Sequence, residues 1–444
     1  MNSSTVVLST ARTPFGKLGG ALASLDATTL GAVALLAALE RSGIDPSDVE
    51  HVIFGEVLQA GVGQNPARQV LFKTGLAKTT TAETVNKVCA SGLLSVASAM
   101  RLIDAGANSV VAAGGMESMS NAPYLLTQAR GGYRFGNGTL VDAMISDGLW
   151  DAYFPMTMSA QGSIVANETG MTREEQDRFG YESHRRAHAA HEAGHFGDEI
   201  VAVDVATKAK GKVVLTRMPR LGNVRVPVMA GGGGSDMWNH TPSETFTFDY
   251  DRYSPFVSGD VPFTRVDRDE AVRADASLES MAKLKALEEN GTITAANAPG
   301  VNDGAAAMIL ADARWAKEHG HEALATVIDH ATVGWDSPYI SLTPAMAAQK
   351  LMDKHGLSAS QIAVWEINEA FSAVAITSAR ILGIGQETIN RFGGAVAMGH
   401  PIGASGARIA GTLVNQLRKR GGGLGIASIC SGGGQGDALL VRVD

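Results

Sequence analysis

The sequence predicts an α/β layer protein that is built from a duplicated unit with an inserted loop domain. Short β-rich runs alternate with alanine-rich helical patterns over residues 6–120, and such alternation is typical of α/β layer folds. The alternation returns over residues 321–444. Residues 121–296 are more polar and do not keep it. These observations predict two similar halves with a loop domain between them.

In the N-terminal half, runs of β-branched and apolar residues alternate with alanine-rich segments. Strands are expected over residues 52–54, 84–86 and 109–113, and helices over residues 67–73 and 91–105. The last of these strands runs into a pair of glycines. The order of elements predicts strand–helix–strand units of an α/β sheet.

The C-terminal half repeats this order of elements. Strands are expected over residues 325–328, 363–365 and 426–429, and helices near residues 345–354, 371–382 and 405–420. Each half has a glycine-flanked turn that opens a long helix, Cys89-Ala90-Ser91-Gly92 in the first and His400-Pro401-Ile402-Gly403 in the second. We therefore assign residues 1–121 and 297–320 to one half, 321–444 to the other, and 122–296 to the loop domain.

The composition excludes several classes of protein. The chain has 444 residues, 45% of them apolar, and a formal charge of −8 without a long basic run, so it lacks the positive charge that nucleic-acid binding requires. No stretch reaches the ~18 apolar residues of a membrane span, and the first residues do not resemble a signal peptide. Two cysteines are too few for a disulfide framework. We expect a soluble, cytoplasmic protein that binds neither nucleic acid nor membrane.

Cys89 is the first candidate for chemistry. It follows the strand expected over residues 84–86 and begins the helix expected over residues 91–105. Unpaired backbone N–H groups and the helix dipole at such a position are expected to lower the pKa of a thiol and to favour the thiolate. Taken alone, the residue would more often be a small buried hydrophobe, as free cysteines usually are, and the other motifs favour the nucleophile.

Three further segments place polar residues near strand ends and glycines. Asn368 follows the strand over residues 363–365, and open α/β sheets place their sites at such ends, although an asparagine there could also cap a helix. His400 lies among glycines that allow close approach of the backbone to a ligand, and it can act as a base. Cys430 ends a strand beside Gly432, whose amide could help to form an oxyanion hole.

A zinc signature of the H-E-x-x-H type is formed by His191-Glu192-Ala193-Gly194-His195. Zinc binding would require the helix to continue through both histidines, but Gly194 and the glycine at 197 indicate its end, and no third ligand is evident. We interpret the segment as a histidine-rich, solvated helix. No metal site is predicted.

Taken together, four segments resemble the thiolase family, the acyl-CoA C-acyltransferases. They match the four catalytic loops of that family in order: residues 85–92 (Val-Asn-Lys-Val-Cys-Ala-Ser-Gly), 368–371 (Asn-Glu-Ala-Phe), 399–408 (Gly-His-Pro-Ile-Gly-Ala-Ser-Gly-Ala-Arg) and 430–436 (Cys-Ser-Gly-Gly-Gly-Gln-Gly). Supporting matches lie at residues 11–14, 115–120 and 302–307. The resemblance covers nearly the whole chain outside residues 212–266. It implies a duplicated, five-layered αβαβα fold with an inserted loop domain.

The resemblance also implies a role for each catalytic residue. Cys89 would attack a first acyl-CoA while His400 accepts its proton, which gives an acyl-enzyme and free CoA. Cys430 would move a proton to or from the α-carbon of acetyl-CoA. His400, with a water positioned by Asn368, would hold the enolate oxygen, and the amides of Cys89 and Gly432 would hold the tetrahedral oxyanion. No metal or redox cofactor is implied, and CoA is a substrate and product.

On the substrate side, the resemblance assigns acyl-CoA binding to Met158, Arg273, Ser280 and Phe371. Arg273 and Ser280 match positions near the CoA nucleotide and pantetheine. The family pattern is not kept at Thr157, where a histidine is usual, at Pro299, where a serine is usual, or over residues 340–344, which usually read Met-Gly-x-Gly-Pro. These departures are expected to affect the choice of acyl group.

The expected activity is the reversible Claisen condensation of two acetyl-CoA to acetoacetyl-CoA and CoA. The alternatives are cleavage of longer or branched 3-ketoacyl-CoA in fatty-acid degradation and a non-catalytic protein that binds acyl-CoA. The second would have lost one of the catalytic residues, and all are present. A ketosynthase acting on carrier-protein thioesters would have histidines in place of Asn368 and Cys430.

Two segments are expected to set surface and assembly. Residues 212–266 read as an insertion with seven aromatic residues in 55 positions, and because disordered linkers are poor in aromatics we expect it to be ordered, either as added surface or beside the acyl pocket or a subunit contact. Lys208 to Arg225 is basic and could meet the phosphates of CoA or form a solvated hairpin. Residues 132–136 lie where the family makes its tetramer contact, so a homodimer or homotetramer is expected.

Overall fold

The computed structural model describes residues 4–206, 215–216, 256–257 and 263–444. In the N-terminal half the sheet order is β4 (Thr81–Val85), β3 (His51–Gly55), β5 (Val110–Ser118), β12 (Asn302–Asp312) and β1 (Thr5–Arg12), with β2 (Gly16–Lys17) paired to β12. Its helices are α1 (Ala27–Ser42), α2 (Pro66–Lys73) and α3 (Ser91–Asp104). Strands and helices therefore alternate here as predicted.

The C-terminal half has the sheet order β14 (Ile362–Ile367), β15 (Gly423–Ser431), β16 (Gln435–Val443) and β13 (Ala325–Gly334). Its helices are α9 (Thr343–His355), α10 (Ser372–Leu382), α11 (Ala395–Met398) and α12 (Ser405–Lys419), and α8 (Ala313–Glu318) connects the halves. A short β1–β13 pairing, Val6 with Thr326 and Val7 with Ala325, joins both sheets into one of ten strands.

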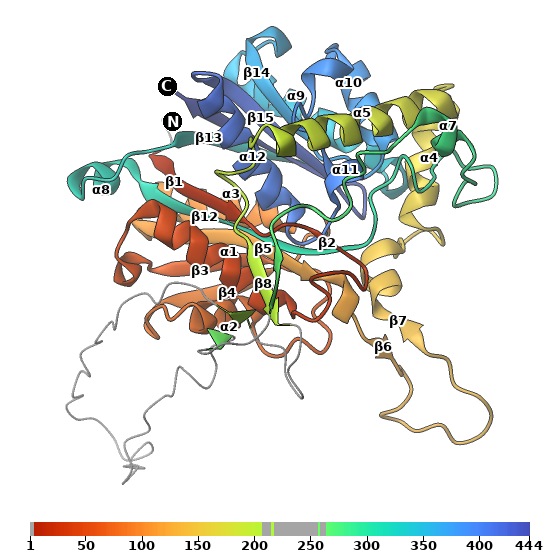
Figure 1. The fold of residues 1–444 in the computed structure, drawn as a ribbon, viewed down its shortest axis with the longest axis horizontal. Coiled ribbons are helices and arrows are strands. Elements are labelled where there is room, and N and C mark those ends of the chain that lie inside the picture. The colour runs from red at the N-terminus through yellow and green to blue at the C-terminus, as the bar shows by residue number, and fades with distance from the viewer. Residues whose placement is uncertain (1–3, 207–214, 217–255, 258–262) are drawn as a thin grey trace.

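The layers follow from which helices pack on which strands. Helices α1 and α2 cover the outer face of the N-terminal strands, and α9 covers the outer face of the C-terminal strands. Between the two sets of strands, α3 packs on β5 and β3, α12 packs on β15 and β14, and the two helices pack on each other (Figure 1). The predicted duplicated, five-layered α/β fold is confirmed.

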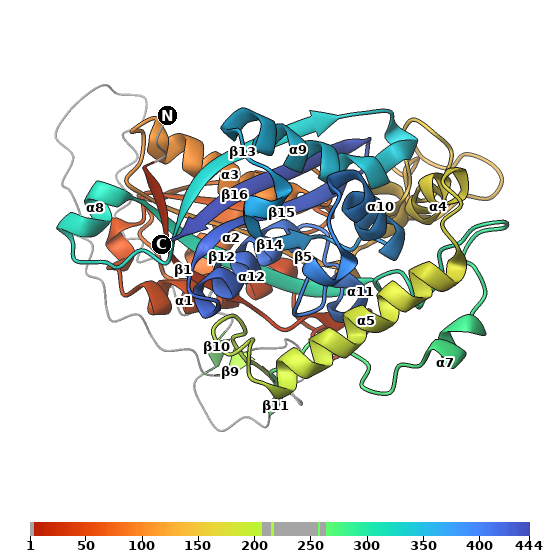
Figure 2. The same ribbon diagram turned by 90° about the horizontal axis from the view of Figure 1, so that it is seen from above.

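The loop domain contributes β6 (Tyr124–Leu125), β7 (Val141–Asp142), α4 (Met158–Glu168), α5 (Arg173–Glu192) and α7 (Leu278–Ala282). It also contributes a four-stranded sheet in the order β10 (Phe256–Val257), β9 (Leu215–Thr216), β8 (Val203–Ala206) and β11 (Phe263–Val266). Helix α5 packs on α11 and α10 along one side of the molecule (Figure 2). Between β6 and β7 a long loop extends away from the body (Figure 1).

The expected insertion lies mostly outside the described residues. Five of its seven aromatic residues, together with most of the basic stretch from Lys208 to Arg225, fall there, so its predicted order is not addressed by the structure. Within residues 4–206 and 263–444, no helix is long and apolar enough to cross a membrane.

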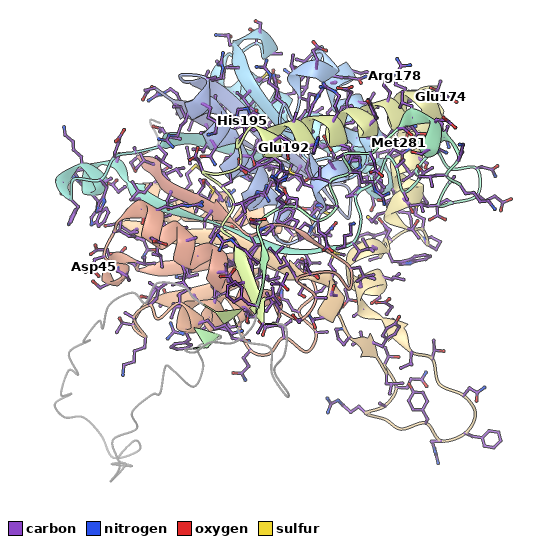
Figure 3. The ribbon with its side chains drawn as sticks, in the orientation of Figure 1. Asp45, Glu174, Arg178, Glu192, His195 and Met281 are labelled. Atoms are coloured by element: carbon purple, nitrogen blue, oxygen red, sulfur yellow. The ribbon has the colours of Figure 1, made fainter. Side chains whose placement is uncertain are left out.

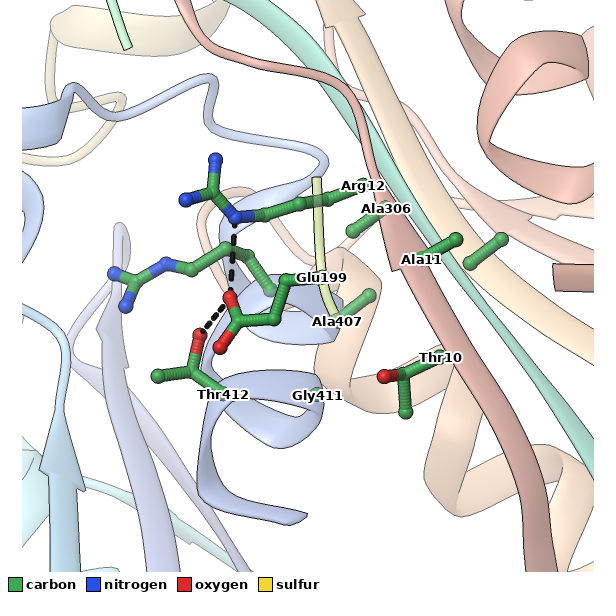
Figure 4. Close-up of a pocket in the computed structure, with 10 residues that line it drawn as sticks. Thr10, Ala11, Arg12, Glu199, Ala306, Ala407, Gly411 and Thr412 are labelled. Carbon is green, nitrogen blue, oxygen red and sulfur yellow. Dashed lines mark hydrogen bonds and ion pairs between the residues drawn. The ribbon is translucent and has the colours of Figure 1, made fainter. Parts of the chain in front are cut away.

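One buried charge cluster ties the two halves to the loop domain. Arg12 on β1 donates to both oxygens of Asp269, at 2.7 and 3.0 Å, and through Nε to Glu199 at 3.2 Å. Glu199 also accepts the hydroxyl proton of Thr412 on α12 at 2.9 Å (Figure 4). Burial alone would raise the pKa of Asp269, but the Arg12 and His191 contacts hold it well below its usual range. The cluster fixes how the three parts meet.

Candidate active site

Cys89 lies in a tight turn between β4 and α3. Val88, just before it, has φ +45°, a left-handed conformation that costs a β-branched residue about 1–3 kcal/mol. The turn is held by bonds from the Lys87 N–H to the Ser91 hydroxyl at 2.8 Å, from Ala90 N–H to the Lys87 carbonyl at 3.1 Å, and from Ser91 N–H to the Val88 carbonyl at 3.1 Å. These bonds present Cys89 at a fixed place ahead of α3.

The Cys89 thiol is buried and points toward backbone N–H groups. Burial raises its pKa to about 12, and the N–H groups of Gly432 and of Cys89 itself, which bond to the sulfur, lower it by less. The expectation of a depressed thiol pKa is therefore wrong. The loss of water around the sulfur raises the thiol pKa by more than the start of the helix and the two amide N–H groups lower it.

Cys430 lies at the end of β15, on the opposite side of the same small region. Burial raises the pKa of its thiol well above its usual range, and the charge of a Cys89 thiolate raises it further. Gly432, two residues on, supplies the N–H that contacts the Cys89 sulfur. The structure therefore brings Cys89, Cys430 and the Gly432 amide together, and both thiols are free.

His400 lies in the loop between α11 and α12. Its backbone N–H donates to Asn302 Oδ1 at 2.9 Å. Its Nδ1 lies 2.6 Å from the Ser405 hydroxyl, which donates its own proton to the Pro401 carbonyl at 3.0 Å. Because a hydroxyl has one proton to give, Ser405 accepts from Nδ1–H, and Nε2 keeps its lone pair.

The His400 imidazole is neutral. Burial, with the charge of Arg408, lowers its pKa to about 3. Nε2 is buried and has no hydrogen-bond partner among the described residues. The loop touches the start of α3, since a β-carbon at Gly92 would lie 2.8 Å from the Gly403 carbonyl oxygen. His400 thus presents a buried Nε2 that can accept a proton, and it lies beside α3, the helix that follows Cys89.

Asn368 follows β14, where its backbone N–H donates to the Ser428 carbonyl at 2.9 Å. Both polar atoms of its side-chain amide are buried without a partner in the described part of the chain. The helix α10 begins later, with Phe371 at its N-cap position, so the alternative that Asn368 caps this helix is wrong. Buried amides are normally paired, and this pair of free polar atoms fits a ligand or a bound water.

Glu117 is a further residue of the site that the sequence did not single out. Its carboxylate accepts the backbone N–H groups of Val57 and Leu58, both at 3.1 Å, and of Gly403 at 3.0 Å. Burial raises its pKa to about 7 against the lowering effect of these amides. Glu117 thereby connects the end of β5 to the His400 loop. The supporting match at residues 115–120 contains it, but gave it no role.

The predicted substrate residues fall into two groups. Met158 and Phe371 pack in the same apolar cluster as Cys430. Arg273 and Ser280 are exposed in the loop domain. The backbone N–H of Arg273 donates to His184 Nδ1 at 3.2 Å. The hydroxyl and backbone N–H of Ser280 bond to Ser277, and its carbonyl accepts from the Lys283 N–H. The structure brings the first pair to the cysteines and leaves the second pair at the surface.

The H-E-x-x-H segment does not form a zinc site. Helix α5 ends at Glu192. Figure 3 labels Glu192 and His195 at that end of the helix. His191 Nε2 bonds to Asp269 at 3.1 Å, and His195 stacks on Phe392. No group of metal-binding side chains occurs among the described residues. The helix is not simply solvated as expected, because His184 is buried and burial lowers its pKa to about 4.

Comparison with known proteins decides the family. Models of the thiolase N-terminal and C-terminal domains match residues 5–218 with 256–314, and residues 321–443. The chain belongs to the thiolase family. The gap in the first match, residues 219–255, falls inside the expected insertion.

Named relatives cover nearly the full length of this thiolase. Acetyl-CoA acetyltransferase of Cupriavidus necator is 41% identical over 438 residues, 98% of each chain, and the Escherichia coli acetyl-CoA acetyltransferase is 41% identical over 439 residues, also 98% of each. The crystal structure of the Bacillus anthracis acetyl-CoA acetyltransferase superposes with a TM-score of 0.85 at 32% identity, covering 100% of this chain and 99% of the other. The thiolase fold and the full-length likeness therefore agree.

Proposed function

We propose that this thiolase catalyses the reversible condensation of two acetyl-CoA to acetoacetyl-CoA and CoA. The observation that carries this proposal is that two buried, free thiols lie close enough to interact electrostatically, and that the Gly432 N–H bonds to the sulfur of one of them, Cys89. A neutral histidine with an available nitrogen and an asparagine with a free amide complete the set. The acetyl-CoA acetyltransferase relatives, about 40% identical over the full chain, support the same reaction.

In the first step the Cys89 sulfur attacks the thioester carbon, and the C–S bond to CoA breaks. The raised pKa of Cys89 means that no thiolate accumulates at rest, so the proton leaves as the new bond forms. His400 Nε2 is suited to take it, because Ser405 occupies Nδ1–H, and can return it to the CoA sulfur. The oxyanion is stabilised by the amides of Gly432 and Cys89.

In the second step Cys430 removes a proton from the α-carbon of acetyl-CoA, and the carbon attacks the Cys89 acyl group. The new C–C bond forms as the bond from that acyl carbon to the Cys89 sulfur breaks, and the proton held by Cys430 restores the Cys89 thiol. Cys430 must be a thiolate at the start of this step. With Cys89 acylated, its sulfur cannot carry the charge that would raise the Cys430 pKa, so burial alone opposes the thiolate. In cleavage, a thiol kept protonated by burial is suited to give its proton to the same carbon. The Asn368 amide N–H would donate to the enolate oxygen, directly or through a water, and His400 Nε2 would join it only while it carries a proton, because its lone pair cannot donate.

The alternative of longer or branched 3-ketoacyl-CoA substrates in fatty-acid degradation depends on the segment that departs from the family pattern. Ser337, at the start of the 3₁₀ segment Ser337–Leu342, donates its hydroxyl to Asp151, which also accepts from Gln161 at 2.5 Å. Asp151 therefore ties the segment that departs from the family pattern to the loop domain. This tie can change the space beside the acyl group.

The proposal extends to location and assembly. Two free thiols are stable in the reducing cytoplasm. The loop between β6 and β7 exposes apolar side chains, with Phe135 fully exposed and Leu126 and Leu140 more than half exposed. Such side chains fit a contact between copies of the chain, which supports a homo-oligomer.

The test is CoA-dependent consumption of acetoacetyl-CoA and of a medium-chain 3-ketoacyl-CoA at matched concentrations. Preference for acetoacetyl-CoA is expected, and preference for the longer chain would select the alternative. Cys89→Ala should abolish both turnover and exchange of acetyl groups with CoA, because it removes the sulfur that is proposed to form the acyl-enzyme. A Cys89→Ala protein that still exchanged acyl groups would refute the nucleophile assignment, and a wild-type protein that turned over neither substrate would refute the activity.

A further inference from the structure

A buried group of charged side chains lies directly behind the Cys89 turn and takes no part in the chemistry above. The Lys87 ammonium lies 2.9 and 2.7 Å from the two Asp437 carboxylate oxygens and 2.6 Å from the Thr332 hydroxyl. Asp437 Oδ1 also lies 2.8 Å from His330 Nε2, and His330 Nδ1 lies 3.0 Å from Arg101 Nη2. The side chains of Lys87, His330 and Asp437 are 13%, 1% and 0% exposed. We name these residues the Lys87 cluster.

The hydrogen bonds of the cluster have one consistent direction. Arg101 can only donate, so His330 Nδ1 is the acceptor and Nε2 carries the proton. Nε2–H then donates to Asp437, which receives a second donor from Lys87. Asp437 Oδ1 thus receives two donors, and Oδ2 is held by its ion pair with the Lys87 ammonium alone.

The cluster is connected to both cysteines through the backbone. Lys87 precedes Cys89 by two residues, and its carbonyl accepts the hydroxyl proton of Ser431, the residue after Cys430. On β16, Asp437 pairs with Ile429 of β15, and the next pair along is Cys430 with Gly436. Lys87 and Asp437 therefore join the turn before the first thiol to the strand pair that carries the second.

The turn needs such an anchor because of Val88. Its φ of +45° is unfavourable for a β-branched residue and persists only where its surroundings hold it. On the C-terminal side of Val88 the turn is held by α3. On its N-terminal side, the Lys87 N–H and carbonyl bond to the Ser91 and Ser431 hydroxyls, and the Lys87 ammonium pairs with Asp437. We propose that Lys87 and Asp437 are positioning residues that hold Cys89 in register with Gly432 and Cys430. The kinetic consequence rests on the proposed function.

The first test is Asp437→Asn. This change keeps the acceptor for His330 and removes the charge that holds Lys87, whose part-exposed ammonium can turn to water. Displacing a reacting atom by about 1 Å costs on the order of 10²-fold in rate, so we expect kcat for acetoacetyl-CoA cleavage to fall about 10- to 100-fold with KM within about twofold. The control is Lys73→Met, which removes a Lys–Asp pair of similar length, 2.8 Å to Asp26, with a lysine 16% exposed. It should leave kcat unchanged.

A second variant separates positioning from stability. Lys87→Met alone leaves a buried, unbalanced carboxylate and can prevent folding. The double variant Lys87→Met/Asp437→Asn removes both charges, so its Tm should return toward that of the wild type. We expect kcat to stay low. Recovery of kcat together with Tm would show that the pair serves stability only and would overturn the proposal.

A third readout does not depend on turnover. The rate constant for iodoacetamide alkylation of each cysteine is followed by mass spectrometry of the corresponding peptides. Moving the Cys89 sulfur off the Gly432 N–H raises its pKa, and one pKa unit reduces the thiolate about tenfold. We expect slower alkylation of Cys89 in Asp437→Asn and in the double variant, and an equal or higher rate in both would overturn the proposal. If the wild type shows no turnover, the proposed function fails, and this rate still tests the positioning.

Discussion

The ring of Phe371 lies so close to Gly162 of α4 that a β-carbon on the glycine would sit 2.5 Å from Cδ2. Real β-carbons do not approach an atom that closely, so the ring or the helix would have to move. Phe371 belongs to the apolar cluster that contains Met158 and Cys430. The contact therefore connects the packing of the loop domain to the second thiol.

We expect Gly162→Ala to destabilise the protein. Overpacking costs about 1–3 kcal/mol, which exceeds the gain of about 1 kcal/mol that alanine has over glycine in a helix. Urea denaturation measures the change. The control is Gly411→Ala in α12, where the nearest atom, Thr10 Cβ, is 3.5 Å from the added carbon and where the helix gain should prevail. Equal effects of the two substitutions would contradict the contact.

Removing the Ser405 hydroxyl should slow the reaction through His400. Without it, Nδ1–H loses its acceptor, and the imidazole is free to turn or to move its proton to Nε2. We expect Ser405→Ala to lower kcat about 10- to 100-fold in steady-state cleavage of acetoacetyl-CoA. Ser378→Ala is matched, because Ser378 also donates to the carbonyl four residues before it, Val374 at 2.8 Å in α10. A kcat that fell equally in both variants would point to a structural cause.

Cys430→Ala should separate the two half-reactions. Acylation needs only Cys89 and His400, so incubation with acetyl-CoA should still add one acetyl group to Cys89, as seen by intact-protein mass spectrometry. Condensation should fall by about 10²- to 10⁴-fold, because the α-proton has no acceptor. The Cys89→Ala protein should take up no acetyl group. Absence of the label from Cys430→Ala as well would mean that the second thiol acts in the first step.

The buried carboxyl of Glu56 should make stability depend on pH. Burial, and then the charge of Glu117, raise its pKa to about 9, and neither oxygen has a partner among the described residues. Between its unfolded pKa, near 4.5, and about 9 the folded state binds more protons, so stability falls as pH rises. Glu56→Gln keeps the shape without the charge. It should raise the free energy of unfolding by about 1–3 kcal/mol at about pH 8.5 and by little at about pH 5.

Urea denaturation at both pH values measures the Glu56 effect. The matched control is Glu322→Gln, because Glu322 is exposed and its loss should change neither value. A gain for Glu56→Gln of the same size at both pH values would show that the substitution acts through packing and not through the proton.

The alternation of β-rich runs with alanine-rich segments predicted most elements of the two halves, because apolar runs form the buried strands and alanine-rich segments form the buried helices. The strand over residues 109–113 was predicted too short: β5 continues to Ser118 through Gly114 and Gly115. Glycine in a sequence argues against a strand, because it weakens strand interiors. In this structure, however, a β-carbon on Gly115 would overlap the Gly403 carbonyl oxygen. Gly115 is required by the loop that carries His400 and Gly114 by Ala306 of β12 and the Phe54 ring, and no local pattern reveals either contact.

The catalytic candidates were found from motifs, whereas their surroundings were not. The pKa of Cys89 was expected to be low, since the sequence shows the helix start but not the burial that outweighs it. The pairing of Lys87 with Asp437 joins residues 350 positions apart, and the roles of Ser405 and Glu117 depend on which atoms face them. Such relationships arise only when the two halves pack.

The place of β12 has a consequence for how the chain is made. This strand lies between β1 and β5, yet the ribosome reaches it only after residues 119–301, which include the whole loop domain. At about 5–20 residues per second, roughly 10–40 s pass between completion of β5 and the arrival of its neighbour. Throughout that interval the nascent N-terminal sheet has two unpaired strand edges, which are prone to aggregate. Co-translational protection by chaperones should therefore matter more for yield than the stability of the finished enzyme.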